Sequence, residues 1–84
     1  MSSKHRRTLA AVFEDPVRSS ILWSDVVSLF VYLGAELRQG SGSRVRVTLG
    51  EQHATFHRPH PQKETPQRTV VSIRRFLAQA GVQP

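Results

Sequence analysis

The hydrophobic pattern of this chain changes its period twice, and this change constrains the fold more than any other feature. From Val26 to Leu33 the apolar residues recur at i, i+3, i+4 and i+7, which is typical of a helix with one buried side. After Gly34 apolar and polar residues alternate, as in strands of a sheet with one covered face. Helical spacing returns from Val70 onward. A chain of 84 residues forms one domain with a thin core, so helices and sheet must share that core.

The alternating segment predicts three antiparallel strands, over residues 35–38, 44–49 and 53–58. Turns are expected at residues 40–42 and 50–52, where glycine allows positive φ angles. The residues predicted to face the core are Val45, Val47, Leu49, Ala54 and Phe56. The outer face should therefore carry Arg44, Arg46, His53 and His57.

Three helices are expected around this sheet. The first covers residues 5–13, before Pro16 interrupts the pattern, and residues 17–23 form a connector that turns Ile21 and Trp23 inward. The second follows Ser24, a plausible N-cap, and ends at Gly34. The third covers residues 69–80. The predicted fold is α+β, a three-stranded antiparallel sheet packed on one face by helices in the order α-α-β-β-β-α.

The net charge of +6 is distributed unevenly along the chain. Residues 1–42 hold five Lys/Arg and four Asp/Glu, whereas residues 43–84 hold seven and two. A basic half predicts an anionic partner such as nucleic acid, an acidic protein or an anionic membrane, and the alternative is a surface that serves solubility. The chain contains no cysteine, which excludes disulfides and a cysteine nucleophile and suits a cytoplasmic protein. No signal peptide or membrane span is expected, because the longest apolar stretch, residues 26–35, is about half the required length.

His53, His57 and His60 have a spacing that would suit a metal site on a helix. Pro59 and Pro61 exclude a helix here, and two strand residues four apart lie about 13 Å from each other. A zinc–nitrogen bond is only about 2 Å long, so no metal site is expected. A domain this small also lacks room for a separate cofactor pocket, so no small-molecule cofactor is expected.

Acid–base chemistry suits these histidines better. An imidazole exchanges its proton near neutral pH and can move the proton of a ribose 2′-hydroxyl, while a nearby cation stabilises the charge that develops on the phosphate. His57 and His60 are therefore the candidate acid and base, and the alternative is that they only bind the loop or a phosphate. The candidate RNA-binding residues are Arg44, Arg46, Arg58, Lys63, Arg68, Arg74 and Arg75, because guanidinium groups suit phosphate oxygens.

Four segments carry a resemblance to a known family. They are Leu33-Gly34 at a helix end, Gly42-Ser43 before a valine-rich strand, His57-Arg58-Pro59-His60 after the next strand, and residues 71–81, VSIRRFLAQAG. With these segments the chain resembles the HicA toxins, small bacterial mRNA interferases of type II toxin–antitoxin systems. The resemblance covers about residues 23–81. It leaves residues 1–22 as an N-terminal helical extension of a single domain that spans residues 1–84.

The resemblance implies a fold like that of a double-stranded-RNA-binding domain, mRNA as substrate and a HicB-like antitoxin as partner. It also places the family's catalytic histidine directly after Gly42-Ser43, where this chain has Arg44. An arginine stays protonated and cannot act as a general base. Either His57 or His60 has taken over the proton transfer, or the protein binds RNA without cutting it. A third hypothesis is a protein-interaction domain that docks an acidic, antitoxin-like partner.

Overall fold

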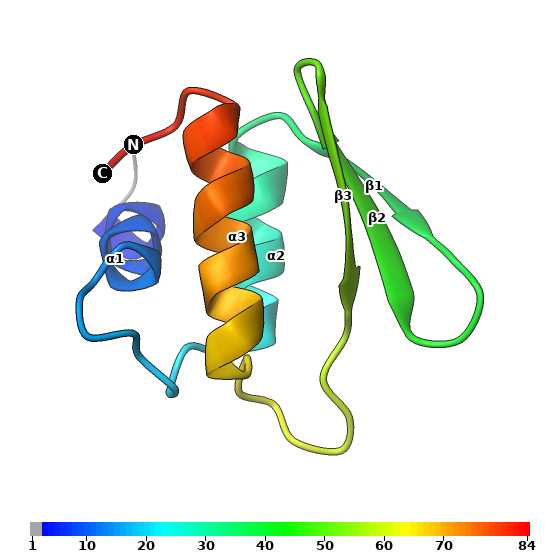
Figure 1. Ribbon diagram of the computed structural model, residues 1–84, viewed down its shortest axis with the longest axis horizontal. Helices are drawn as coiled ribbons and strands as arrows, with labels where there is room; N and C mark the ends of the chain where they lie inside the picture. Colours follow the sequence, from blue (N-terminus) through cyan, green and yellow to red (C-terminus); the bar gives the residue numbers. More distant parts are fainter. Residues whose placement is uncertain (1–2) are drawn as a thin grey trace.

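The computed structural model describes residues 3–84, and it contains three helices and one three-stranded sheet (Figure 1). The elements in chain order are α1 (Ser3–Val12), α2 (Trp23–Tyr32), β1 (Glu36–Gln39), β2 (Arg44–Leu49), β3 (Gln52–His57) and α3 (Gln67–Gln79). The strands are antiparallel in the order β1-β2-β3. The predicted α+β class and the order α-α-β-β-β-α are confirmed.

The turn between β2 and β3 places these strands in the predicted antiparallel orientation. Gly50 and Glu51 join β2 to β3 as a two-residue hairpin, because Leu49 pairs with Gln52. Gly50 has a φ of 60°, and no other residue type in the described chain has a positive φ, which indicates a type II′ turn. Val45 and Val47 point into the core, and Arg44 and Arg46, which alternate with them, are exposed. The alternation predicted from the sequence is therefore confirmed.

Helix α2 begins two residues earlier than expected, at Trp23. Its N-cap is Leu22, which offers no side-chain hydrogen bond, so the prediction of Ser24 as N-cap is wrong. The predicted end is correct. Gly34 has a φ of 88°, its N–H bonds the Val31 carbonyl, and the Ala35 N–H bonds the Phe30 carbonyl. These two bonds form a Schellman motif, whose left-handed position favours glycine.

The elements form three layers around one core. Phe30 of α2, Phe56 of β3 and Phe76 of α3 pack against one another with ring centroids 5.9–6.0 Å apart. Helix α1 lies on the side of α2 and α3 that faces away from the sheet (Figure 1). Its residues Leu9 and Val12 are buried in the same cluster as the other core residues. The outer face of the sheet is thus left without a covering helix.

Side-chain hydrogen bonds attach the N-terminal segment to α3. The Arg74 guanidinium donates from Nε to the Val12 carbonyl at 2.9 Å and from Nη2 to the Glu14 carbonyl at 2.7 Å. The Gln67 amide donates to the Val17 carbonyl at 2.9 Å. Residues 3–22 are therefore packed into the domain and bonded to it. Within residues 3–84, no helix combines the length and the apolar character that a bilayer crossing requires.

Candidate RNA interface

The outer face of the sheet brings Arg44 and His57 together. The two residues are register partners on β2 and β3. The Arg58 N–H bonds the Ser43 carbonyl at 2.8 Å, so the neighbouring pair 43/58 lies in a narrow hydrogen-bonded position and 44/57 is a non-hydrogen-bonded pair. In such pairs the two Cβ atoms are about 4.5–5.5 Å apart and the side chains are close. Both side chains are exposed. The residue at the predicted catalytic position and a candidate base thus lie side by side.

Two further rows cross the outer face. Arg38 of β1 pairs with Arg46 of β2, which in turn pairs with Thr55 of β3. The last row contains Glu36, Thr48 and His53, and the Thr48 hydroxyl lies 3.0 Å from Nδ1 of His53. The three arginines, Arg38, Arg44 and Arg46, are all exposed. Only Arg38 among them has an acidic neighbour within the described chain, Glu36 at 3.2 Å. The outer face therefore carries a net positive charge.

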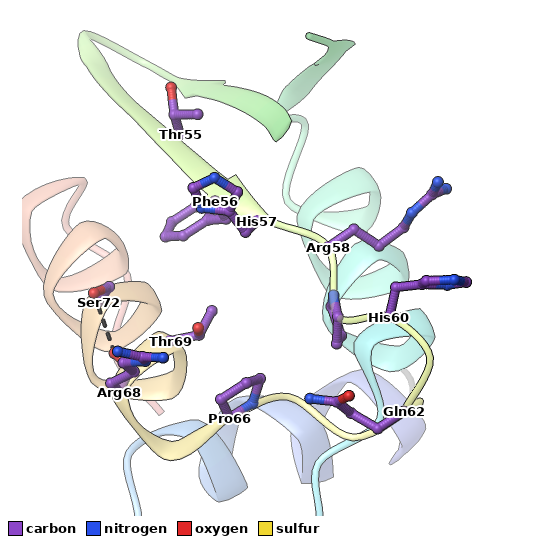
Figure 2. A pocket seen from close by; sticks show the side chains of 11 residues that line it. Thr55, Phe56, His57, Arg58, His60, Gln62, Pro66, Arg68, Thr69 and Ser72 are labelled. Atoms are coloured by element: carbon purple, nitrogen blue, oxygen red, sulfur yellow. Dashed lines mark hydrogen bonds between the residues drawn. The ribbon is translucent and has the colours of Figure 1, made fainter. Parts of the chain in front are cut away.

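A second feature, which we call the β3–α3 groove, lies between the end of β3, the loop that follows it and the first turns of α3 (Figure 2). It has a volume of about 580 Å³. Its polar wall is formed by Thr55, His57, Arg58, His60, Gln62, Arg68, Thr69 and Ser72. Helix α3 has no acidic residue in its first turn, so the positive end of its dipole is not neutralised there. The groove is therefore suited to an anion.

Figure 2 separates the predicted groups by the direction of their side chains. Arg58 and His60 project to the same side, away from α3, whereas Arg68 lies on α3 at the opposite wall of the groove. His57 lies at the end of β3, above the opening between these walls. His57 is thus the only histidine in the described chain that belongs both to the groove and to the pair with Arg44. The structure does not bring His57 and His60 to one common point.

Backbone hydrogen bonds hold the loop that carries these residues. The Trp23 N–H bonds the Lys63 carbonyl at 2.9 Å, and the Thr65 N–H bonds the Ile21 carbonyl at 2.7 Å. Thr65 itself is fully buried. Helix α3 already begins at Gln67, so the predicted start at residue 69 is two residues too late. The two backbone hydrogen bonds thus anchor the loop beside the start of α2, close to the cationic side chains that the loop carries.

The remaining predicted cations fall into different surroundings. Lys63 is exposed on the far side of the loop, where it lines a second groove with Arg58. Arg75 is exposed and follows Arg68 by seven residues, so the two share one side of α3. Arg74 is half-buried, and both of its hydrogen bonds go to carbonyls at or just past the end of α1, those of Val12 and Glu14. Its donors are directed to the layer opposite the sheet.

Several residues of these surfaces were not among the predicted site residues. Arg38 lies in a predicted strand, but the pairing that places it beside Arg46 depends on the strand register. Gln62 and Thr69 line the groove and belong to no motif in the sequence. Ser72 also lines the groove, and it lies in the segment 71–81 that carries the family resemblance. It follows Arg68 by one helical turn, and its hydroxyl donates to the Arg68 carbonyl at 3.2 Å. Among residues 3–84, no three His, Asp or Glu side chains cluster as ligands of one metal ion would.

Comparisons with known proteins give one match. The model of the family described as the HicA toxin of bacterial toxin–antitoxin systems matches residues 23–82. This range begins at the first residue of α2 and includes the whole sheet and α3, whereas α1 lies outside it. Searches of curated proteins and of solved structures gave no significant match.

Proposed function

Because this chain belongs to the HicA toxin family and is a toxin of a toxin–antitoxin system, we propose that it binds mRNA and acts as an mRNA interferase. The substrate lies with its phosphates between the outer face and the β3–α3 groove. The contacting cations are Arg44, Arg46, Arg58, Lys63, Arg68 and Arg75, and Arg38 joins them. Arg74 is omitted because its guanidinium already donates to two carbonyls. The site of action is the bacterial cytoplasm, where mRNA is found.

One observation carries this proposal, namely the cross-strand pair of Arg44 and His57 at the mouth of the groove. Cleavage of RNA without a metal needs a group that removes the 2′-hydroxyl proton and a cation beside the reacting phosphate. His57 can supply the first and Arg44 the second. Their strand pairing supports this assignment, because paired side chains of this kind are close enough to contact one phosphate. Arg68 adds a second guanidinium on the opposite wall.

The chemistry follows from this geometry. The neutral His57 imidazole accepts the 2′-hydroxyl proton, and the 2′-oxygen forms a bond to the adjacent phosphorus while the P–O5′ bond breaks. The departing 5′-oxygen takes a proton from water, or from His60 if the loop brings it closer when RNA binds. Arg44 stabilises the additional negative charge on the phosphoryl oxygens during the step. The products are a 2′,3′-cyclic phosphate and a 5′-hydroxyl end.

A direct test is incubation of the purified toxin with RNA in excess EDTA. We expect fragments with cyclic phosphate and 5′-hydroxyl ends, and growth arrest with mRNA fragmentation when the toxin is expressed without its antitoxin. Full-length RNA after prolonged incubation with folded protein would sink the cleavage proposal. A separate experiment tests the RNA interface. RNA binding should fall steeply as the salt concentration rises, because each phosphate contact releases counterions.

A specific observation favours a second candidate function, a non-catalytic RNA-binding module. Arg44 occupies the position at which the resemblance places the family's catalytic histidine, and arginine cannot remove a proton. In that case Arg44 only binds phosphate, and His57 donates a hydrogen bond to it. Salt-sensitive binding of RNA without any cleavage would identify this function.

The family supports an antitoxin as partner of this toxin. We propose that the partner is HicB-like and presents acidic residues to the outer face, where Arg38, Arg44 and Arg46 are exposed without a covering helix. Complementary charge also accelerates association. If this third function, protein docking, is the main one, charge reversal at Arg46 should weaken antitoxin binding while RNA binding is absent altogether.

A further inference from the structure

A second groove lies on the other side of the loop that follows β3. We call it the connector groove, because one wall is formed by residues 22–24, where the connector enters α2, and the other by loop residues 58, 59 and 61–63. Its apolar lining consists of Leu22, Trp23, Pro59 and Pro61, and Arg58 and Lys63 stand beside them. The volume is about 450 Å³, which falls within the range of sites for small organic ligands.

The exposure of Leu22 needs an explanation. Leu22 is 39 % exposed, although its neighbours Ile21 and Trp23 are 6 % and 8 % exposed and belong to the core. Its backbone is fixed, because residue 22 is the N-cap of α2 and forms a bridge with Glu64. The Leu22 side chain is therefore held on the surface next to two prolines, and it forms a preorganised apolar wall.

The cations identify the kind of ligand that this wall suits. Arg58 and Pro59 line both the connector groove and the β3–α3 groove, so the two grooves adjoin along the loop. Figure 2 shows Arg58 projecting away from α3, toward the outer side of the loop. A ligand that continues out of the β3–α3 groove past Arg58 meets an apolar wall flanked by positive charge. A nucleotide has this combination of a flat, weakly polar base and an anionic phosphate.

We propose that the connector groove is a nucleobase subsite for single-stranded RNA. The inference rests on the proposed RNA binding. The base of a nucleotide that neighbours the reacting phosphate packs on Leu22, Pro59 and Pro61, while Arg58 and Lys63 bind the flanking phosphates. Bases in a duplex are paired and stacked with one another, so the subsite selects unpaired RNA. Trp23 contributes an edge only, because little of its surface is exposed.

The test uses Leu22→Ser, which removes the apolar side chain but places a favourable N-cap residue at the start of α2. The probes are a short 2′-O-methyl oligoribonucleotide, which cannot be cleaved at the 2′ position, and the same strand with abasic residues. Val31→Ser is the matched control, since Val31 is 61 % exposed on α2 and lines neither groove.

We expect the wild-type protein to bind the intact strand more tightly than the abasic one. Stacking of a base on an aromatic side chain contributes about 1–3 kcal/mol, and packing on the smaller Leu22 side chain should contribute an amount at the lower end of this range. Leu22→Ser should therefore weaken binding of the intact strand about fivefold to tenfold. Binding of the abasic strand, and all binding by Val31→Ser, should be unchanged.

Three results would overturn the subsite. Equal loss for both strands would show that Leu22 acts through the fold. No loss for either strand would show that the base lies elsewhere, with RNA binding itself intact. Loss of antitoxin binding alone would assign the groove to a protein contact. If the wild-type protein binds neither strand, the proposed RNA function fails together with the subsite, and this outcome is distinct from the other three.

Discussion

Helix α3 carries two arginines whose surroundings lead to opposite roles. Arg68 stands in the first turn, exposed in the wall of the β3–α3 groove, and its guanidinium has no hydrogen-bond partner within residues 3–84. Arg74, less than two turns later, is half-buried and donates to the carbonyls of Val12 and Glu14. A guanidinium whose donors are already hydrogen-bonded stabilises the fold, whereas an unbonded one in the wall of a groove is available to a ligand. Composition alone cannot separate the two.

The same contrast extends to the layers on either side of α2 and α3. The sheet side leaves Arg44 and His57 exposed as a cross-strand pair, and His57 and Arg68 line one groove. The α1 side joins buried Leu9 and Val12 to the core, and there Lys4 pairs with Asp25 and Arg74 donates to the Val12 carbonyl. We therefore expect substitutions on the sheet side to change RNA chemistry at constant stability. Substitutions on the α1 side should do the reverse.

The largest effect is expected at His57. His57→Ala removes the proposed base and should lower the rate of RNA cleavage by about 10²–10⁴-fold, the usual contribution of a general acid or base. The free energy of unfolding should change by less than about 0.5 kcal/mol, because the side chain is exposed. Single-turnover cleavage and urea unfolding measure the two quantities.

His60→Ala and His53→Ala are the matched controls. His60 projects away from α3 in Figure 2, and His53 lies two rows from Arg44 with Nδ1 beside Thr48. Both variants should retain more activity than His57→Ala. A larger loss in His60→Ala would move the proton transfer into the loop and break the assignment of His57.

The second effect concerns stability. Arg74→Ala removes two charge-assisted hydrogen bonds and should lower the free energy of unfolding by about 1–3 kcal/mol. RNA affinity at saturating folded protein should stay within twofold of wild type. Urea unfolding measures the change in stability, and a binding titration measures the RNA affinity. Arg75→Ala is the control for stability, because Arg75 is exposed on the adjacent position of the same helix.

The sequence predicts the fold more completely than it predicts the site. The alternation of Arg44–Leu49 and the glycines at 34 and 50 predict the sheet, the Schellman end of α2 and the exposed face, because those signals are local. Other features depend on contacts between separate segments of the chain. They are the pairing of Arg38 with Arg46 and the hydrogen bonds of Arg74 to the end of α1. Arg74 and Val12 are 62 residues apart, and no short pattern records that contact. Ser24 is not the N-cap because the helix starts two residues earlier, directly after Leu22, which the bridge to Glu64 holds in place.

A smaller effect is expected at Arg68. Arg68→Ala should weaken RNA binding severalfold and lower the slope of log affinity against log salt by about one phosphate contact. Stability should remain within about 0.5 kcal/mol of wild type, since the exposed side chain has no acceptor within residues 3–84. The measurement is a titration at several salt concentrations. An unchanged salt slope would exclude Arg68 from the interface.

The smallest effect tests the α1 side once more. Lys4 of α1 pairs with Asp25 of α2 at 3.5 Å, and their side chains are 59 % and 32 % exposed. Ion pairs this open to solvent contribute about 0.2–1 kcal/mol, so Lys4→Ala should cost less than Arg74→Ala, and the cost should diminish in high salt. Urea unfolding at low and high salt measures this difference. If Lys4→Ala costs as much as Arg74→Ala, α1 is held chiefly by surface charge. The difference between the hydrogen-bonded Arg74 and the unbonded Arg68 would then no longer explain why one side of α3 serves stability and the other side serves RNA binding.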